Sequence, residues 1–193
     1  MKLITIVVLL SAFIATPAMA ADNTGRFYLG ADFGWVTLTD TDPGGTDFPN
    51  PNSLRFSGGY HFSPMLAAEV GYAGIGDSTL SDPTGEVTLK NSALQVAAVG
   101  TFPVSSSFDV IGKVGLSFNS NKASGTGAYS GLGTSNSKTS YLFGIGAQYN
   151  VNEQFGIRAQ YEDFGKTTIS SNLSGLSWDG GIKQFSVGVI YNF

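Results

Sequence analysis

Apolar side chains alternate with small or polar ones along most of the chain after Arg26. In the first such stretch Phe27, Leu29, Ala31, Phe33 and Trp35 are separated by Tyr28, Gly30, Asp32 and Gly34. Successive side chains of a β-strand point to opposite faces, so this alternation predicts a strand with one apolar face. The same pattern returns over residues 53–62, 66–73, 94–102, 108–118, 140–149, 154–162 and 184–193. The sequence therefore predicts eight strands of about ten residues each.

The segments between these strands alternate in length. Short turns are expected near residues 63–64, 103–106 and 150–153, whereas residues 39–52, 75–88, 119–139 and 165–181 form long segments rich in Gly, Ser, Thr, Asn and Asp. Membrane barrels have short turns on the periplasmic side and long loops outside the cell. We therefore predict an all-β fold, an eight-stranded antiparallel up-and-down transmembrane β-barrel with four extracellular loops.

Alternation does not by itself say which face of the barrel points inward, because a soluble lipocalin-like barrel keeps its apolar face inside. Composition favours the membrane barrel. Only 12% of the residues are charged, against about 25% in soluble domains. The polar face consists mostly of Gly, Ala, Ser and Gln, which fit the narrow interior of an eight-stranded barrel. The apolar face is therefore expected to contact lipid.

Aromatic residues on the apolar face occur near the ends of the predicted strands. Rings at these heights are typical of the aromatic girdles at the two boundaries of a membrane. The residues assigned to this girdle are Phe27, Trp35, Phe62, Phe102, Phe108, Tyr149, Phe155 and Tyr161.

The first twenty residues have the features of an export signal. Lys2 precedes an apolar run over residues 3–14, which is too short to span a bilayer, and Ala18 and Ala20 supply the small residues of a cleavage site. We expect residues 1–20 to be removed, leaving residues 21–193 as one barrel domain. The remaining nine basic and fourteen acidic residues give a formal charge of −5. This balance and the absence of a basic cluster argue against nucleic acid as a partner.

Several strands resemble those of the small outer-membrane β-barrel proteins, which include the transmembrane domain of OmpA-like proteins and the OmpX-like barrels. The similar segments are residues 27–31, 58–62, 156–164 and 185–193. In that family an aromatic C-terminal strand is read by the barrel-assembly machinery, which implies this role for Tyr191 and Phe193. Because the sequence ends at Phe193, we expect no periplasmic peptidoglycan-binding domain.

The predicted lumen face carries charges of both signs: Asp32, Arg55, Glu69, Asp109, Lys113, Arg158 and Glu162, together with the polar Gln160. A buried charge without a partner is very costly, so these groups are expected to pair. One interpretation is a salt-bridge network that fills the barrel. The alternative is a gate, in which Lys113 and Arg158 exchange between Glu69, Asp109 and Glu162 and open a narrow path for water.

The sequence favours a non-enzymatic structural role, in which the barrel presents its loops for contact at the cell surface. A narrow porin-like channel is the first alternative. A lipid A-modifying enzyme is the second, supported only by a partial likeness of His61-Phe62-Ser63 to outer-membrane deacylases; His61 is expected to point inward beside a short turn. The expected partners are outer-membrane lipid and lipopolysaccharide, the barrel-assembly machinery and periplasmic chaperones during biogenesis, and a surface ligand of the loops. With no Cys and a single His, we expect no cofactor and no metal.

Overall fold

The computed structural model describes residues 24–39, 50–128, 130, 133–170 and 177–193. The predicted signal peptide, residues 1–20, and most of the first predicted loop lie outside these residues. The strands are β1 (Phe27–Thr39), β2 (Asn52–Ser63), β3 (Leu66–Asp82), β4 (Gly85–Pro103), β5 (Phe108–Gly127), β6 (Gly133–Asn150), β7 (Phe155–Ser170) and β8 (Ser177–Asn192).

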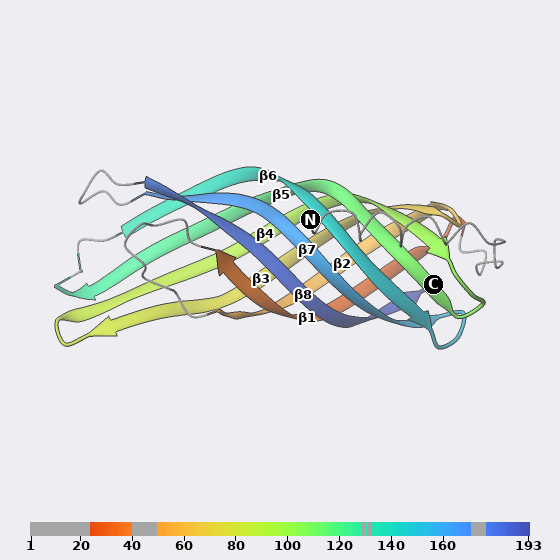
Figure 1. The fold of residues 1–193 in the computed structure, drawn as a ribbon, viewed down its shortest axis with the longest axis horizontal. Coiled ribbons are helices and arrows are strands. Elements are labelled where there is room, and N and C mark those ends of the chain that lie inside the picture. The colour runs from red at the N-terminus through yellow and green to blue at the C-terminus, as the bar shows by residue number, and fades with distance from the viewer. Residues whose placement is uncertain (1–23, 40–49, 129, 131–132, 171–176) are drawn as a thin grey trace, which may run out of the picture.

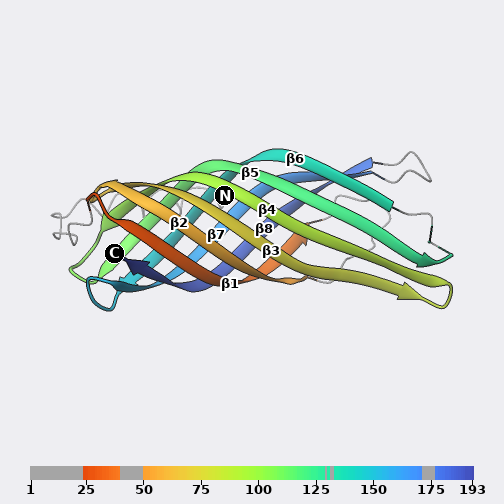
Figure 2. The ribbon, with the colours of Figure 1, turned by 180° about the vertical axis from the view of Figure 1, so that it is seen from behind.

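The eight strands form a closed barrel in which every strand pairs antiparallel with its neighbours in sequence (Figures 1 and 2). Closure comes from β1 and β8, which pair from Tyr28 opposite Asn192 to Thr39 opposite Gly181. The predicted fold class, an eight-stranded antiparallel β-barrel, is confirmed. Within the described residues no helix is long and apolar enough to cross a membrane.

The apolar face of the barrel points outward. Phe56 is 57% exposed, whereas its neighbours Arg55 and Ser57 are buried. Val114 on β5 is likewise 54% exposed and lies next to the buried Lys113. A soluble protein would place these residues the other way round. This inverted arrangement, with a continuous apolar outer surface, is the one expected of a barrel whose solvent is lipid.

The strands are longer than the ten residues that the sequence predicted, and two of the predicted loops are largely strand. Residues 75–88 form the upper part of a hairpin in which Asp82 pairs with Gly85, and most of residues 119–139 pair in the same way between β5 and β6. The last predicted loop, residues 165–181, belongs to β7 up to Ser170 and to β8 from Ser177 onward. The prediction failed because these stretches are rich in Ser, Thr, Gly and Asn and hold too few apolar residues for an alternating pattern along a whole strand. Their backbones nevertheless continue the hydrogen-bond ladder that the barrel starts.

The extensions of β3 to β6 form a four-stranded sheet that continues the barrel wall, here called the outer sheet (residues 78–91, 119–127 and 133–138). Pairing between β4 and β5 continues to Gly85 opposite Gly127, and pairing between β5 and β6 continues to Ser124 opposite Gly133. In contrast, β1 and β2 stop pairing at Trp35 opposite Asn52. Figure 1 shows β3 to β8 continuing past β1 and β2 at the end opposite the C-terminus of β8, with β3, β4 and β5 reaching furthest.

Candidate functional site

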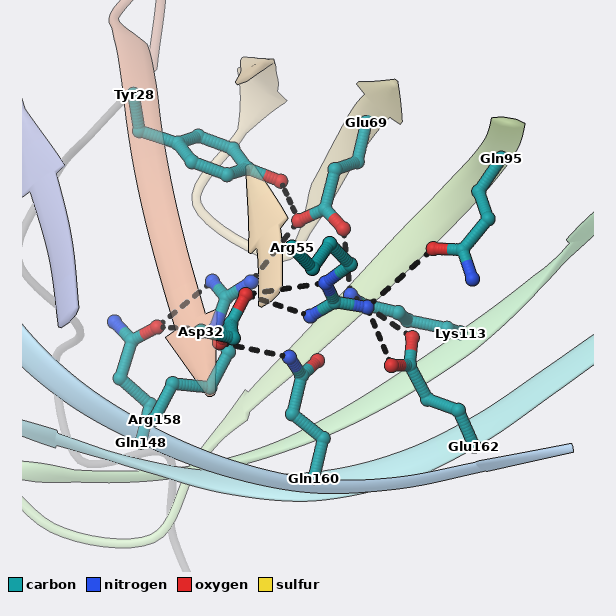
Figure 3. A network of polar contacts seen from close by, with 10 residues as sticks. All are labelled: Tyr28, Asp32, Arg55, Glu69, Gln95, Lys113, Gln148, Arg158, Gln160 and Glu162. Atoms are coloured by element: carbon teal, nitrogen blue, oxygen red, sulfur yellow. Dashed lines mark hydrogen bonds and ion pairs between the residues drawn. The ribbon is translucent and has the colours of Figure 1, made fainter. Parts of the chain in front are cut away.

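Six charged side chains meet in the middle of the lumen (Figure 3). They come from five strands: Asp32 on β1, Arg55 on β2, Glu69 on β3, Lys113 on β5, and Arg158 and Glu162 on β7. Each occupies a position of the alternating pattern whose side chain points into the barrel. Three are basic and three are acidic, so the cluster is formally neutral.

Arg55 joins two of the carboxylates. Its Nε and Nη2 donate to Oδ2 of Asp32 at 3.1 and 2.9 Å, and its Nη1 donates to Glu162. Nη1 also lies 3.4 Å from Oε1 of Gln95. Asp32 and Arg55 are directly opposite in the β1–β2 register, so the two strands deliver this pair locally.

Lys113 and Arg158 connect the remaining carboxylate, Glu69, to the same network. Lys113 Nζ lies 2.5 Å from Oε1 of Glu69 and 3.3 Å from Oε1 of Glu162. Arg158 Nη1 donates to Oε2 of Glu69 at 3.0 Å, and Tyr28 donates its hydroxyl to the same oxygen at 2.7 Å. The ion pairs therefore form one continuous chain across the lumen.

Amide side chains complete the network. Gln148 Oε1 accepts from Nε and Nη2 of Arg158 at 2.9 and 2.8 Å, and Gln160 Nε2 donates to Asp32 Oδ1 at 3.3 Å. Sequence reasoning placed Gln160 on the lumen face but gave no role to Tyr28, Gln95 or Gln148. Their inward positions in the alternating pattern were the available signal.

Asp109 does not belong to this cluster. Its Oδ2 accepts a hydrogen bond from Asn150 Nδ2 at 2.7 Å. Among the described residues, no basic side chain forms an ion pair with Asp109. In this arrangement Asp109 is therefore paired with neither Lys113 nor Arg158, and the exchange of either base onto Asp109 stays a prediction. Asp109 is the first inward residue of β5, near a short turn, whereas Lys113 lies four residues further along the strand.

Apolar clusters lie on both sides of the charged layer. Tyr28, Ala67, Val99 and Ile190 form one cluster toward the short turns. A larger cluster lies toward the outer sheet and consists of Val36, Ala73, Ile75, Ala93, Ala97, Leu142, Phe164 and Ile182. Along β1 Asp32 lies between Tyr28 and Val36, so the ion pairs lie between the two apolar clusters. Buried polar side chains share the heights of these clusters, because Gln184 is opposite Val36 and His61 is opposite Ala67. All six charged side chains are buried, and ion pairs interact more strongly in the protein interior than at a surface in contact with water.

All eight residues assigned to the aromatic girdle have exposed side chains on the outer surface of the barrel. Six of them lie toward the short turns, where Phe108, for example, is opposite Tyr149. Trp35 and Tyr161 lie toward the outer sheet, each opposite Phe185 in register. Tyr191 contacts both Phe155 and Phe193, with ring centroids 5.0 Å apart in each case.

His61 lies on the lumen side of β2. It is only 8% exposed, and its ring centroid is 5.0 Å from that of Tyr28. The ring therefore faces the barrel interior rather than the surface on which Phe62 is exposed. His61 is therefore not exposed on the face of the barrel that carries the apolar wall.

A closed eight-stranded barrel with an apolar exterior and a charged interior has counterparts among known proteins. The family described as outer membrane protein beta-barrel domain matches residues 6–193. The chain belongs to this family. It is thus a protein of the bacterial outer membrane, as the resemblance implied.

Curated relatives carry the name outer membrane protein A. The protein from Salmonella typhi is 27% identical over 194 residues, which cover 98% of this chain and 54% of the relative, and the one from Yersinia pseudotuberculosis is 28% identical over 185 residues, which cover 93% and 52%. This outer-membrane barrel chain spans about half the length of the curated relatives it matches.

Solved structures share the fold. The attachment invasion locus protein Ail of Yersinia pestis superposes with a TM-score of 0.61 and 20% identity, covering 88% of this chain and 99% of Ail. Neisserial surface protein A gives a TM-score of 0.62 and 21% identity, covering 86% and 97%. At these identities the likeness shows the barrel fold and leaves function to be argued from this chain's own residues.

Proposed function

We propose that this barrel is a non-enzymatic anchor that holds the outer sheet and the neighbouring β7–β8 hairpin at the cell surface for contact with external ligands. The way the barrel wall is held together carries this proposal. A formally neutral network of ion pairs joins five strands inside the barrel and cross-links its wall. The outer sheet, in contrast, extends well beyond the barrel and offers polar surface.

The proposed partners follow from the two ends and the outer wall of the barrel. Lipid and lipopolysaccharide surround the apolar wall, and the C-terminal strand with Tyr191 and Phe193 is the proposed signal for the barrel-assembly machinery after transfer by periplasmic chaperones. A sulfated glycan is the first surface ligand to try, because a structure of Ail was solved with the heparin analogue sucrose octasulfate.

The contact role can be tested by trimming the outer sheet. Replacing residues 79–88 by Asn-Gly leaves Ser78 opposite Leu89 and closes the hairpin with a favourable two-residue turn. Cells that express the parent barrel are expected to bind immobilised heparin more strongly than cells without it, and the trimmed variant should lose most of this gain. Surface amount and the heat-dependent gel mobility of the folded barrel serve as controls.

Two results would contradict the anchor role. One is binding by the parent that does not exceed that of cells lacking the barrel across sulfated, neutral and acidic glycans. The other is full binding by the trimmed variant, which would assign the contact to another part of the chain.

A narrow channel remains the second candidate, favoured by one observation. Lys113 lies within ion-pair distance of both Glu69 and Glu162, so its partner could change without a charge leaving the lumen. Single-channel recording in planar bilayers tests this gate. If the parent conducts and Glu69→Ala leaves the current unchanged, the gate is excluded.

A further inference from the structure

Two lysines lie side by side on the outward face of the outer sheet. Lys90 on β4 is directly opposite Lys122 on β5, and Ser135 on β6 follows in the same row. Lys90 shares its face with Leu94, four residues along the strand, and Lys122 shares its face with Phe118. Leu94 and Phe118 are exposed members of the apolar wall. The lysine pair therefore lies on the same outward face as this wall, further toward the end of the outer sheet.

Hydroxyl groups flank the lysine pair on both sides. In the row nearer the membrane wall, Ser92 is opposite Ser120, which in turn is opposite Ser137. In the row further out, Thr88 is opposite Ser124. The patch thus combines two ammonium groups with hydroxyl donors on a regular sheet.

The charges of this patch are incompletely balanced. Lys90 Nζ lies 3.1 Å from Oδ2 of Asp77, with both side chains about half exposed. Lys122 is exposed, and within the described part of the chain no carboxylate pairs with it. Like charges directly opposite each other destabilise a pair of strands. The patch therefore carries a net positive charge that an external anion would offset.

The height of the patch indicates which anion it meets. Four residues of a tilted strand correspond to about 10 Å along the barrel axis, so the lysine backbones lie roughly 10 Å beyond Leu94 and Phe118. The headgroup layer extends about 5–8 Å beyond the hydrocarbon on each side, and lysine side chains readily bend toward it. No strand covers this outward face in the described structure.

From this placement we propose that Lys90 and Lys122 form a binding site for the phosphate groups of a phosphorylated glycolipid in the outer leaflet. The inference rests on the proposed orientation, with the outer sheet outside the cell. Two adjacent ammonium groups match a doubly charged phosphate, and the serine hydroxyls can donate to its remaining oxygens. The site would fix lipid against β4 and β5 and neutralise the lysine pair.

The test uses the full barrel folded into phosphatidylcholine nanodiscs that contain diphosphoryl lipid A, with bound lipid counted by native mass spectrometry. The parent should retain lipid A in preference to phosphatidylcholine. Lys90→Thr combined with Lys122→Thr should weaken retention about tenfold, the order expected for losing two exposed charge contacts. Threonine keeps the strand propensity, and the single variant Lys122→Thr, which also removes the like-charge contact, should fold at least as well as the parent.

Lys183→Thr is the matched control, because it removes the same charge from the outward face of β8, where Lys183 is opposite Asp163. Its retention of lipid A should equal that of the parent. Equal retention by the parent and the double variant, or an equal loss in Lys183→Thr, would overturn the site. Competition by free inorganic phosphate at millimolar concentration would instead assign the site to a soluble anion. These outcomes are independent of glycan binding by cells, which tests the anchor role.

Discussion

Arg158 Nη1 donates to Oε2 of Glu69 at 3.0 Å, although the two residues are 89 positions apart in the sequence. The contact crosses the lumen from β7 to β3. Glu69 is the carboxylate that holds Arg158 in the described structure, whereas Lys113 has both Glu69 and Glu162. The two glutamates of the network are therefore unequal in their importance for stability.

This inequality predicts different costs for two similar substitutions. Glu69→Ala leaves Arg158 with only Gln148 and the ring of Tyr28, and should reduce the free energy of unfolding by about 3–5 kcal/mol, the range for removing one partner of a buried pair. Glu162→Ala should cost less, because Arg55 keeps Asp32 and Lys113 keeps Glu69. Urea unfolding in liposomes, followed by tryptophan fluorescence, measures both. A larger loss in Glu162→Ala would contradict this network.

A second prediction concerns the contact between Gly59 and Tyr28. A Cβ atom at Gly59 would lie 2.2 Å from Cζ of Tyr28, whose hydroxyl donates to Glu69. Gly59→Ala must therefore displace the ring, and we expect a loss of about 1–3 kcal/mol. Gly112→Ala is the control, since a Cβ there meets no atom within 4 Å. The prediction fails if the two variants unfold at the same urea concentration.

The outward apolar face gives a third prediction. Val114 lies midway along the lipid-facing part of β5, and Val114→Lys should cost about 2–4 kcal/mol in a bilayer, as for lysine near the membrane midplane. Ser124→Lys, on the outer sheet of the same strand, should cost about 0–1 kcal/mol by the same depth dependence. Folding yield and unfolding in phospholipid vesicles provide the measurement. Equal losses would mean that Val114 does not face hydrocarbon.

Much of the fold follows from local periodicity. The alternation in residues 27–35 assigns Phe33 to the wall and Asp32 to the lumen, because the side-chain period of a strand is two. The same rule placed Arg55, Glu69, Lys113, Arg158 and Glu162 inside, and low charge with many small residues indicated lipid as the outer solvent. Periodicity did not predict the outer ends of β3 to β6. The Ser- and Thr-rich extensions of β3 to β6 carry few apolar residues, of which Leu89 is buried. Pairing with the neighbouring strands is what keeps most of their length in strand conformation.

The order of residues within each strand is enough to assign side chains to the lumen or to the membrane, since both properties depend on neighbours along one strand. Which charges meet depends on the closed barrel. The stagger of eight tilted strands around a closed barrel sets the relative heights of inward residues, so that Glu69 reaches Lys113 and Arg158 while Asp109 remains near a short turn with Asn150. The ion-pair partners inside the barrel therefore depend on how the strands close into a barrel, and the sequence of one strand does not specify this.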